Sequence, residues 1–369
     1  MSVKNNNNKN KQFLILTINP GSTSTKIGVY RNEISIFETV VRHSTKKLEE
    51  YNKIWDQYSF RKDEIIDILK ENHIKLKNLD AVVGRGGLLR PMRSGVYIVD
   101  EEMIQDARVG IQGEHASNLG CVIAYGIGWE YEIPSFIADP PVVDELEDIA
   151  RVSGNKNIER NSIFHALNIF ATARVYSKRT DNDFKKINLI IAHLGGGITV
   201  AALKNGEVIN VNNGLDEGPF SPQRSGKLPL LKVLEMGFSK KYRYKELKKM
   251  IVGSGGLVSY FMSSDAELIS KKAEAGIENY DLVFKAMAYQ IAEEIGSRAT
   301  NLKGDVKQII LTGGLAYSKY LTELISERVE FIAPVVIYPG ENELEALALA
   351  GLRVLRGKEV AKKYQTNIS

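Results

Sequence analysis

The chain has 369 residues, of which 43% are hydrophobic and 25% charged, as in an ordinary globular protein, and its length suits two domains. The net charge of +4 is too small to predict a nucleic-acid partner. The apolar runs are shorter than the ~18 residues that a membrane span needs. The single cysteine, Cys121, excludes an internal disulfide and fits a reducing cytoplasm.

The first 30 residues contain a polar tail followed by a hairpin. Residues 1–12 are polar and rich in asparagine, so we expect a flexible tail and no signal peptide. Residues 13–30 form two apolar runs split by Asn19-Pro20-Gly21 and the hydroxyl cluster 22–25, which predicts a β-hairpin. Such a turn suits a charged oxyanion such as a nucleotide phosphate, although its hydroxyls could simply cap local backbone groups.

Two strand ends in the first half present candidate functional side chains. Residues 79–83 predict a strand that ends at Arg85, which is flanked by glycines. The guanidinium could bind a carboxylate or phosphate through two hydrogen bonds, or it could simply be solvated. Residues 133–138 predict a strand that delivers Asp139 before two prolines, where open α/β sheets place chemistry. The alternative is that Asp139 caps the turn.

An amphipathic helix is predicted over residues 160–179, with His165 near its start. A histidine in that position is usually a surface or core-edge residue and needs independent support. The five histidines lack the spacing of metal ligands, so we reject a histidine-bound zinc site.

A second hairpin, over residues 188–207, repeats the first at a constant offset. The offset aligns Asn19 with His193, Gly21 with Gly195, Thr25 with Thr199 and Glu33 with Glu207. A unit that recurs once at half-chain spacing favours two homologous domains and argues against a solenoid. Chance similarity between glycine-rich hairpins is the alternative.

The last third reads as alternating strands and helices. Before it, the loop 212–226 presents Arg224, and the basic, aromatic run 240–249 predicts a solvated helix face more than a nucleic-acid contact. Residues 308–312 predict a strand that runs into Gly313-Gly314-Leu315, an arrangement that lets a nucleoside approach the backbone. Glu341-Asn342-Glu343 opens the final helix, where an acidic side chain either favours the helix dipole or holds Mg²⁺ through water.

The motifs NPGSTSTKIG, VVGRGG, IADPP, IFHALN, IAHLGGGIT, PQRSG, ILTGGLA and PGENELEALA occur in this order over residues 13–357. Together they resemble the acetate/butyrate kinase family of the sugar kinase–heat-shock 70–actin superfamily, and within it the butyrate kinases most closely. The resemblance implies an α/β fold of two duplicated ribonuclease H-like domains, mixed five-stranded sheets flanked by helices, with the active site in the interdomain cleft. The implied domains are 13–180, completed by a C-terminal helix over 343–369, and 181–342.

The resemblance also implies which residues bind ATP or ADP. Near the β- and γ-phosphates it places Asn19, Ser22 and Ser24 from the first hairpin, and His193, Gly195, Gly196 and Gly197 from the second. The adenosine-binding turn corresponds to Gly313, Gly314 and Leu315.

The acceptor side and the Mg²⁺ site follow from the same resemblance. Arg85 and Arg224 match the paired arginines that hold the acyl carboxylate and the moving phosphoryl group. His165 matches a histidine that stabilises the transition state, and His115 one that lines the site. The residues that govern Mg²⁺ would be Asp139 and, in preference to Glu341, Glu343.

The implied reaction is ATP + butyrate ⇌ ADP + butyryl phosphate. A carboxylate is already ionised at neutral pH, so direct in-line transfer needs positioning and charge neutralisation but no general base. The run Gly84-Arg85-Gly86-Gly87 lacks the histidine that acetate kinases have two residues before the paired glycines, which favours an acid longer than acetate. Acetate, propionate and branched acids remain alternatives, as does an actin-like or heat-shock-70-like ATPase switch. The family also implies a homodimer or higher homo-oligomer.

Overall fold

The structure is a computed structural model that describes residues 11–364. Most of the tail expected over residues 1–12, and the last five residues of the chain, lie outside the described residues. The chain divides into two compact units. The first runs to Val143 and resumes at Asn342, and the second comprises Asp144–Glu341.

The sheet of the first unit has the order β3-β2-β1-β4-β6-β5. Its strands are β1 (Leu14–Pro20), β2 (Ser24–Arg31), β3 (Ile34–Arg42), β4 (Ala81–Arg85), β5 (Val96–Ile98) and β6 (Ser135–Ala138). The first three pair antiparallel, whereas β1, β4 and β6 run parallel. The prediction of five strands was wrong by one. The three-residue β5 pairs antiparallel with β6 and is too short to show a strand periodicity in the sequence.

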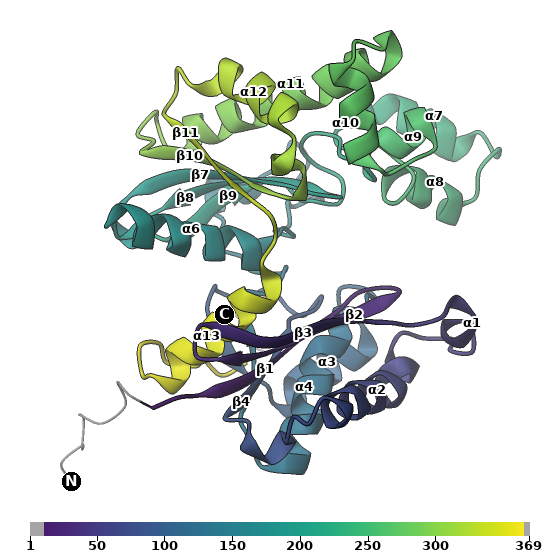
Figure 1. The fold of residues 1–369 in the computed structure, drawn as a ribbon. Coiled ribbons are helices and arrows are strands. Elements are labelled where there is room, and N and C mark those ends of the chain that lie inside the picture. Colours follow the sequence, from purple (N-terminus) through teal and green to yellow (C-terminus); the bar gives the residue numbers. More distant parts are fainter. Residues whose placement is uncertain (1–10, 365–369) are drawn as a thin grey trace. The chain divides into compact units, whose positions relative to one another are not determined.

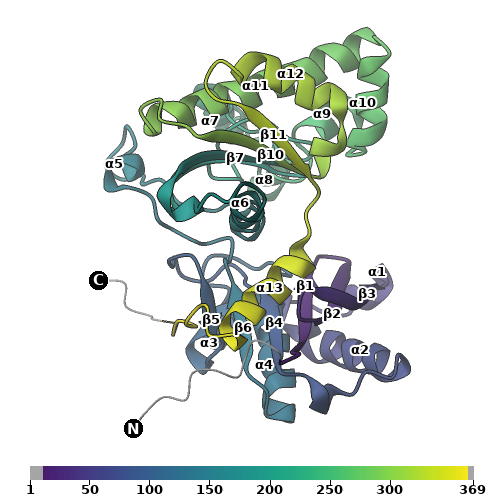
Figure 2. The same cartoon turned by 60° about the vertical axis from the view of Figure 1, so that its left-hand side comes forward.

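Helices cover both faces of this first sheet. The helices of this unit are α1 (Thr45–Leu48), η1 (Trp55–Gln57), α2 (Tyr58–Glu71), η2 (Leu76–Asn78), α3 (Glu101–Val109), α4 (Asn118–Tyr131) and α13 (Glu343–Leu355). On one face α4 packs against β4, β6 and β1, and α2 packs on α4 (Figure 1). Figure 2 shows α13 lying along the other face, against β1 and β4. The final helix of the chain therefore completes the first unit.

The sheet of the second unit repeats this arrangement, with the order β11-β10-β7-β8-β9. Its strands are β7 (Asn188–Leu194), β8 (Ile198–Lys204), β9 (Glu207–Val211), β10 (Gln308–Gly313) and β11 (Val335–Pro339). Strands β7, β8 and β9 pair antiparallel, and β7, β10 and β11 run parallel, as β1, β4 and β6 do. The mixed α/β fold with a duplicated strand order is confirmed.

The two hairpins differ by one residue in their turns. Pro20 pairs with Thr25, which leaves residues 21–24 in the first turn, whereas Leu194 pairs with Ile198 and leaves residues 195–197 in the second. The constant offset of the sequences therefore aligns the first strand of each hairpin but shifts the pairing of the second strand by one position.

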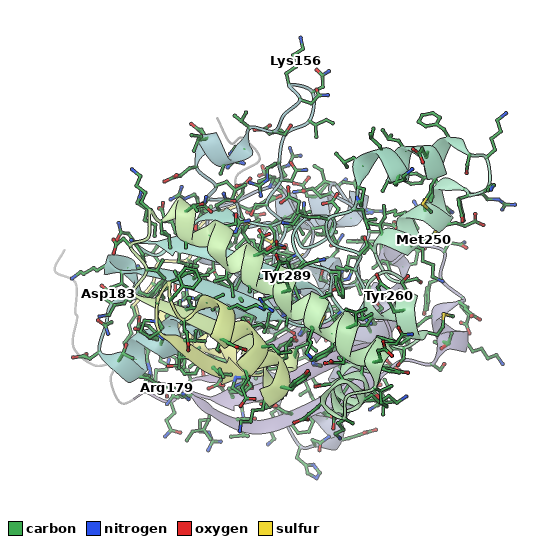
Figure 3. All side chains as sticks on the ribbon, turned by 90° about the horizontal axis from the view of Figure 1, so that it is seen from above. Lys156, Arg179, Asp183, Met250, Tyr260 and Tyr289 are labelled. Carbon is green, nitrogen blue, oxygen red and sulfur yellow. The ribbon has the colours of Figure 1, made fainter. Side chains whose placement is uncertain are left out.

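Helices also cover both faces of the second sheet. The helices of this unit are α5 (Asp148–Arg151), α6 (Ala166–Thr180), η3 (Phe184–Lys186), α7 (Leu230–Phe238), α8 (Tyr244–Ile251), α9 (Leu257–Phe261), α10 (Ala266–Glu274), α11 (Glu278–Asn301), η4 (Gly314–Tyr317) and α12 (Lys319–Val329). Helix α6 packs on β7 and β10 on one face, and α11 crosses β7, β8 and β9 on the other. Tyr289, labelled in Figure 3, lies on α11 with the guanidinium of Arg328 5.2 Å from its ring centroid.

The helix expected over residues 160–179 begins later, at Ala166. The guanidinium of Arg160 donates to both carboxylate oxygens of Glu217, at 2.9 and 2.8 Å, and to the carbonyl of Ala150 at 2.7 Å. These contacts hold the preceding segment as a loop, although its apolar spacing is that of a helix. Because α6 packs on the second sheet, the first unit ends at Val143, before the expected domain boundary at 180.

The described helices were also compared with the length and hydropathy of a membrane span. Within residues 11–364, no helix combines the length and the apolar character that crossing a bilayer requires.

Candidate active site

Three of the predicted site residues lie at the carboxyl ends of adjacent parallel strands in the first unit. Asn19 is near the end of β1, Arg85 ends β4, and Asp139 directly follows β6. The strand register sets Ile18 beside Gly84 and Arg85 beside Ala138, so the three side chains share one edge of the sheet. This edge is where α/β sheets place their ligands.

Asn19 and Arg85 are joined by the first residue of the last helix. One guanidinium nitrogen of Arg85, Nη1, lies 3.2 Å from Oδ1 of Asn19 and 3.0 Å from Oε1 of Glu343. The amide of Asn19 donates to the other oxygen of Glu343. Arg85 therefore already engages a carboxylate, which is the group that the predicted substrate presents.

Asp139 is held in a strained backbone conformation by a reciprocal contact. Its φ is +39°, its Oδ1 accepts a hydrogen bond of 2.6 Å from the amide of Gly95, and its own amide donates to the carbonyl of Gly95 at 3.0 Å. Strain of this kind is maintained only where the surrounding structure fixes it, often at functional sites. The carboxylate of Asp139 is thus fixed in place at the edge of the sheet.

The donor set fits a Mg²⁺ ion that takes part of its shell from a bound phosphate. Asp139 and Glu343 supply carboxylates and Asn19 supplies an amide oxygen, which are the ligands that a hard cation prefers. No group of three or more His, Cys, Asp or Glu residues gathers around a metal position in the described part of the chain. Mg²⁺ needs only one or two protein carboxylates when phosphates and water complete its coordination.

The turn of the first hairpin and the loop before α4 hold the remaining predicted residues of this unit. The amide of Gly21 donates to the carbonyl of Ser24 at 2.7 Å and closes the turn, in which Ser22 is exposed. His115 lies in an exposed loop and shares a hydrogen bond of 2.8 Å with the hydroxyl of Ser117.

In the second unit, His165 and His193 are in direct contact. Their rings stack with centroids 3.9 Å apart and an angle of 17° between the planes. His193 lies near the end of β7, and His165 is the N-cap residue of α6, which packs on β7. Two histidines that the sequence analysis singled out separately, 28 positions apart, are therefore neighbours in the fold.

Each histidine ring is oriented by a second partner. Nδ1 of His165 shares a hydrogen bond of 3.0 Å with the hydroxyl of Thr199, and Nδ1 of His193 shares one of 2.8 Å with Oδ1 of Asn168. Nε2 of His193 lies 3.3 Å from Oε1 of Glu341. Our sequence interpretation missed Asn168, whose signal is its position one helical turn after His165.

Arg224 lies against the turn of the second hairpin. A Cβ atom on Gly197 would be 2.3 Å from Nη1 of Arg224, so only glycine permits this approach. Nη1 donates to the carbonyl of Gly214, and burial lowers the pKa of the guanidinium below its usual value.

The predicted adenosine turn follows β10. Gly313 has a φ of +91°, and a Cβ there would lie 2.3 Å from the carbonyl oxygen of Leu194, which explains the need for glycine. Gly313 and Gly340 exchange two backbone hydrogen bonds of 3.2 and 3.0 Å. Gly314 begins the short helix η4, in which Leu315 is buried.

The predicted residues thus form one cluster in each unit. The first unit brings together Asn19, Arg85 and Glu343. The second unit brings together His165 and His193, with Glu341 on His193 and Arg224 on the glycine turn. The predicted acidic residues Glu341 and Glu343 belong to different units. Each contacts the polar residue in the second-to-last position of the first strand of its hairpin.

Sequence comparison with known proteins identifies the family and the relatives of this chain. A sequence model described as the acetokinase family matches residues 146–344. Butyrate kinase 1 and butyrate kinase 2 of Clostridium acetobutylicum are 52% and 51% identical to this chain over 354 and 355 residues. Each alignment covers 96% of this chain and 100% of the relative.

A solved structure supports the fold. The acetate kinase of Porphyromonas gingivalis superposes with a TM-score of 0.75 at 16% identity, over 93% of this chain and 99% of the other. At that identity the match concerns the fold alone. The sequence relatives and the family match confirm the resemblance inferred from the ordered motifs, and the chain belongs to the acetokinase family.

Proposed function

We propose that this protein is a short-chain fatty acid kinase that catalyses ATP + butyrate ⇌ ADP + butyryl phosphate. The observation that carries the proposal is the 52% identity to butyrate kinase 1, which extends over the whole length of that relative. The chemistry of the two residue clusters is compatible with this reaction and suggests a role for each side chain.

The acceptor requires no general base. A short fatty acid is ionised at neutral pH, and its carboxylate can attack the γ-phosphorus directly. Arg85, which binds a carboxylate in the first unit, is assigned to the acyl carboxylate. Arg224 and His165 are assigned to the charge that develops on the transferred phosphoryl group, where fixed cations and hydrogen-bond donors lower the barrier.

The phosphates of ATP are assigned to the hairpin turns. Ser22 and Ser24 offer hydroxyl and amide donors in the first turn, and Gly195, Gly196 and Gly197 offer amides in the second. Turns of this type bind anions because successive N–H groups point to one side. The adenosine is assigned to the backbone of Gly313, Gly314 and Leu315.

Mg²⁺ is the implied metal ion. Asp139 and Glu343 are the residues that would hold it, directly or through water, and Asn19 orients Glu343. The ion would neutralise phosphate charge and favour one arrangement of the β- and γ-phosphates. The reciprocal contact of Asp139 with Gly95 keeps its carboxylate in place for that purpose.

The length of the acid depends on the volume of the acyl pocket, where one methylene changes the binding free energy by about 1–3 kcal/mol. The test is a ladder of straight and branched C2 to C6 acids, with acyl phosphate trapped as the hydroxamate. We expect kcat/KM to peak at butyrate. A peak at acetate, propionate or isobutyrate would reassign the substrate within the family.

The same assay separates the kinase from an ATPase switch, the alternative that the superfamily suggests. ADP release that depends on the acid indicates the kinase, and release independent of any acid indicates the switch. We further propose self-association into a homodimer or higher oligomer and a cytoplasmic location, the latter supported by the single, buried and reduced Cys121. Sedimentation and cell fractionation test these two proposals.

A further inference from the structure

Arg61 on α2 is fully buried, with 0% of its surface exposed, beneath the turn of the first hairpin. Buried arginines normally form an ion pair. The five N–H groups of this guanidinium donate instead to neutral oxygens. Nη1 donates to the carbonyl of Gly21 at 2.8 Å and to the hydroxyl of Thr25 at 3.3 Å. Nη2 donates to the carbonyl of Ser22 at 3.0 Å, and Nε and Nη2 both donate to Oε1 of Gln57, at 3.0 and 2.8 Å.

These contacts fix the direction of two peptide units. In a trans peptide the C=O and the following N–H point in opposite directions, and the described chain contains no cis peptide bond. The carbonyls of Gly21 and Ser22 accept hydrogen bonds from Arg61, so the amides that follow them in the chain, those of Ser22 and Thr23, point away from Arg61. Both of these residues are exposed. The turn therefore presents the positive ends of two peptide dipoles on its outer side.

The charge of Arg61 acts in the same direction. Burial lowers the pKa of the guanidinium to about 10, so it remains protonated at neutral pH. Glu64 acts on Arg61 through its charge, but its carboxylate contacts Nδ1 of His43 at 2.7 Å. A buried charge without a direct counter-ion is costly, and an anion bound on the outer side of the turn would offset that cost.

The second hairpin uses a comparable arrangement with neutral donors. The carbonyl of Gly196 accepts from the hydroxyl of Ser221 at 2.7 Å and from the amide of Gln223 at 3.3 Å. In both hairpins a turn carbonyl is thus fixed from one side, and only the first has a cation in that role.

We propose that Arg61 is a positioning residue for the phosphates of ATP: it holds the first turn with the amides of Ser22 and Thr23 directed outward and places behind them a positive charge whose hydrogen-bond partners are all neutral. This inference rests on the proposed function, because the anion is taken to be the polyphosphate of ATP. Arg61 itself does not touch the substrate. Its sequence signal is its place on the buried stripe of α2, four residues before Ile65 and eight before Leu69.

The decisive variant is Gln57→Glu. It is nearly isosteric, can accept the same two hydrogen bonds from Arg61, and places a carboxylate in direct contact with the guanidinium, where the native residue is neutral. We expect the Kd of ATP to rise about tenfold, from the loss of one net charge near the phosphates. The Kd of AMP, which lacks the β- and γ-phosphates, should stay within about twofold by the same reasoning, and the thermal midpoint should not fall. A purely structural role for Arg61 predicts no loss of ATP affinity in this variant.

Arg61→Lys tests the geometry separately. Lysine keeps the charge but cannot span two carbonyls and Gln57, so ATP affinity should fall about 10- to 100-fold relative to AMP affinity. Arg298→Lys is the matched control, because Arg298 is a buried arginine of the second unit whose partner is Glu294. It should lower the thermal midpoint without changing the ratio of ATP to AMP affinity.

Calorimetric titration of each variant with ATP and with AMP separates the possible failures. A wild-type protein that does not bind ATP defeats the proposed function. A wild-type protein that binds ATP, together with an unchanged ATP-to-AMP ratio in Gln57→Glu, overturns the role of Arg61. If Arg61→Lys does not fold, the titration of Gln57→Glu with ATP and AMP still tests whether Arg61 positions the phosphates.

Discussion

The imidazole rings of His165 and His193 stack on one another, with their centroids 3.9 Å apart and their planes 17° from parallel. His165 is the N-cap residue of α6 and His193 lies in β7. A separate partner orients each ring, the hydroxyl of Thr199 for His165 and the amide oxygen of Asn168 for His193. A change in one ring therefore removes a packing surface of the other. The two histidines should behave as a coupled pair.

This coupling predicts non-additive kinetics. We expect His165→Ala to lower kcat on the order of 10²-fold, as for the loss of one donor to a developing negative charge. His193→Ala should lower it as well, because the ring of His165 loses its support. In the double variant the loss should be smaller than the product of the two single losses. Strictly multiplicative effects in a double-mutant cycle on kcat would show that the contact has no functional consequence.

The paired arginines give a second prediction. Arg85→Ala and Arg224→Ala should each lower kcat/KM about 10²- to 10⁴-fold, because each removes a fixed cation from a reacting group. Replacement by lysine should recover only part of the loss, since a point charge cannot form two parallel hydrogen bonds. Arg328→Ala, which removes an arginine stacked on Tyr289, is the control and should leave kcat/KM unchanged. Near-wild-type turnover in both site variants would refute their assigned roles.

A third prediction concerns the acidic residues and Mg²⁺. Asp139→Asn and Glu343→Gln should each raise the Mg²⁺ concentration at half-maximal velocity, about tenfold for the loss of one carboxylate. Glu341→Gln should leave this concentration unchanged, because Glu341 contacts His193 in the second unit. A Mg²⁺ titration that shifts only in Glu341→Gln would reverse the assignment of the two glutamates.

The elements of both hairpins were predictable because they depend on local signals. Two apolar runs and a glycine-containing turn define each hairpin within 20 residues, and the strands β1, β2, β7 and β8 form where those signals place them. The similarity of the hairpins also predicted the repeated strand order of the two sheets. The three-residue β5 was not predicted because it is too short to show the alternation of apolar and polar residues that marks a strand.

Contacts between distant residues were not predictable from local pattern. Asn19 and Glu343 are separated by 324 positions, and their hydrogen bond depends on how α13 packs on the first sheet. The start of α6 was misjudged because the loop before it is fixed by Arg160 and Glu217, which only the fold brings together. The burial of Arg61 was overlooked as well, because an arginine is usually exposed even where its position falls in register with the apolar stripe of a helix.

The network beneath the first hairpin predicts a pH dependence of stability. Burial, with the nearby charge of Arg61, lowers the pKa of His43 below its usual value, against the opposing effect of Glu64. Between the lowered pKa and the ordinary value near 6.5, the unfolded chain binds a proton at this residue that the folded protein does not. His43 therefore contributes stability that is fully present above about pH 6.5 and is lost as the pH falls through the folded pKa.

The measurement is urea unfolding of the wild type and of His43→Asn between pH 8 and pH 5. We expect the free energy of unfolding to decrease less steeply with falling pH in the variant. His73→Asn, at an exposed position, is the control and should retain the slope of the wild type. Equal slopes in His43→Asn and the wild type would contradict the lowered pKa.

The most direct test of the proposed kinase is the stoichiometry of ADP and acyl phosphate in one reaction. With ATP, Mg²⁺, butyrate and hydroxylamine present, the proposal predicts one butyryl hydroxamate for each ADP released and negligible ADP release when butyrate is omitted. ADP release at the same rate without butyrate, or without hydroxamate formation, would contradict the assignment of a carboxylate as the phosphoryl acceptor.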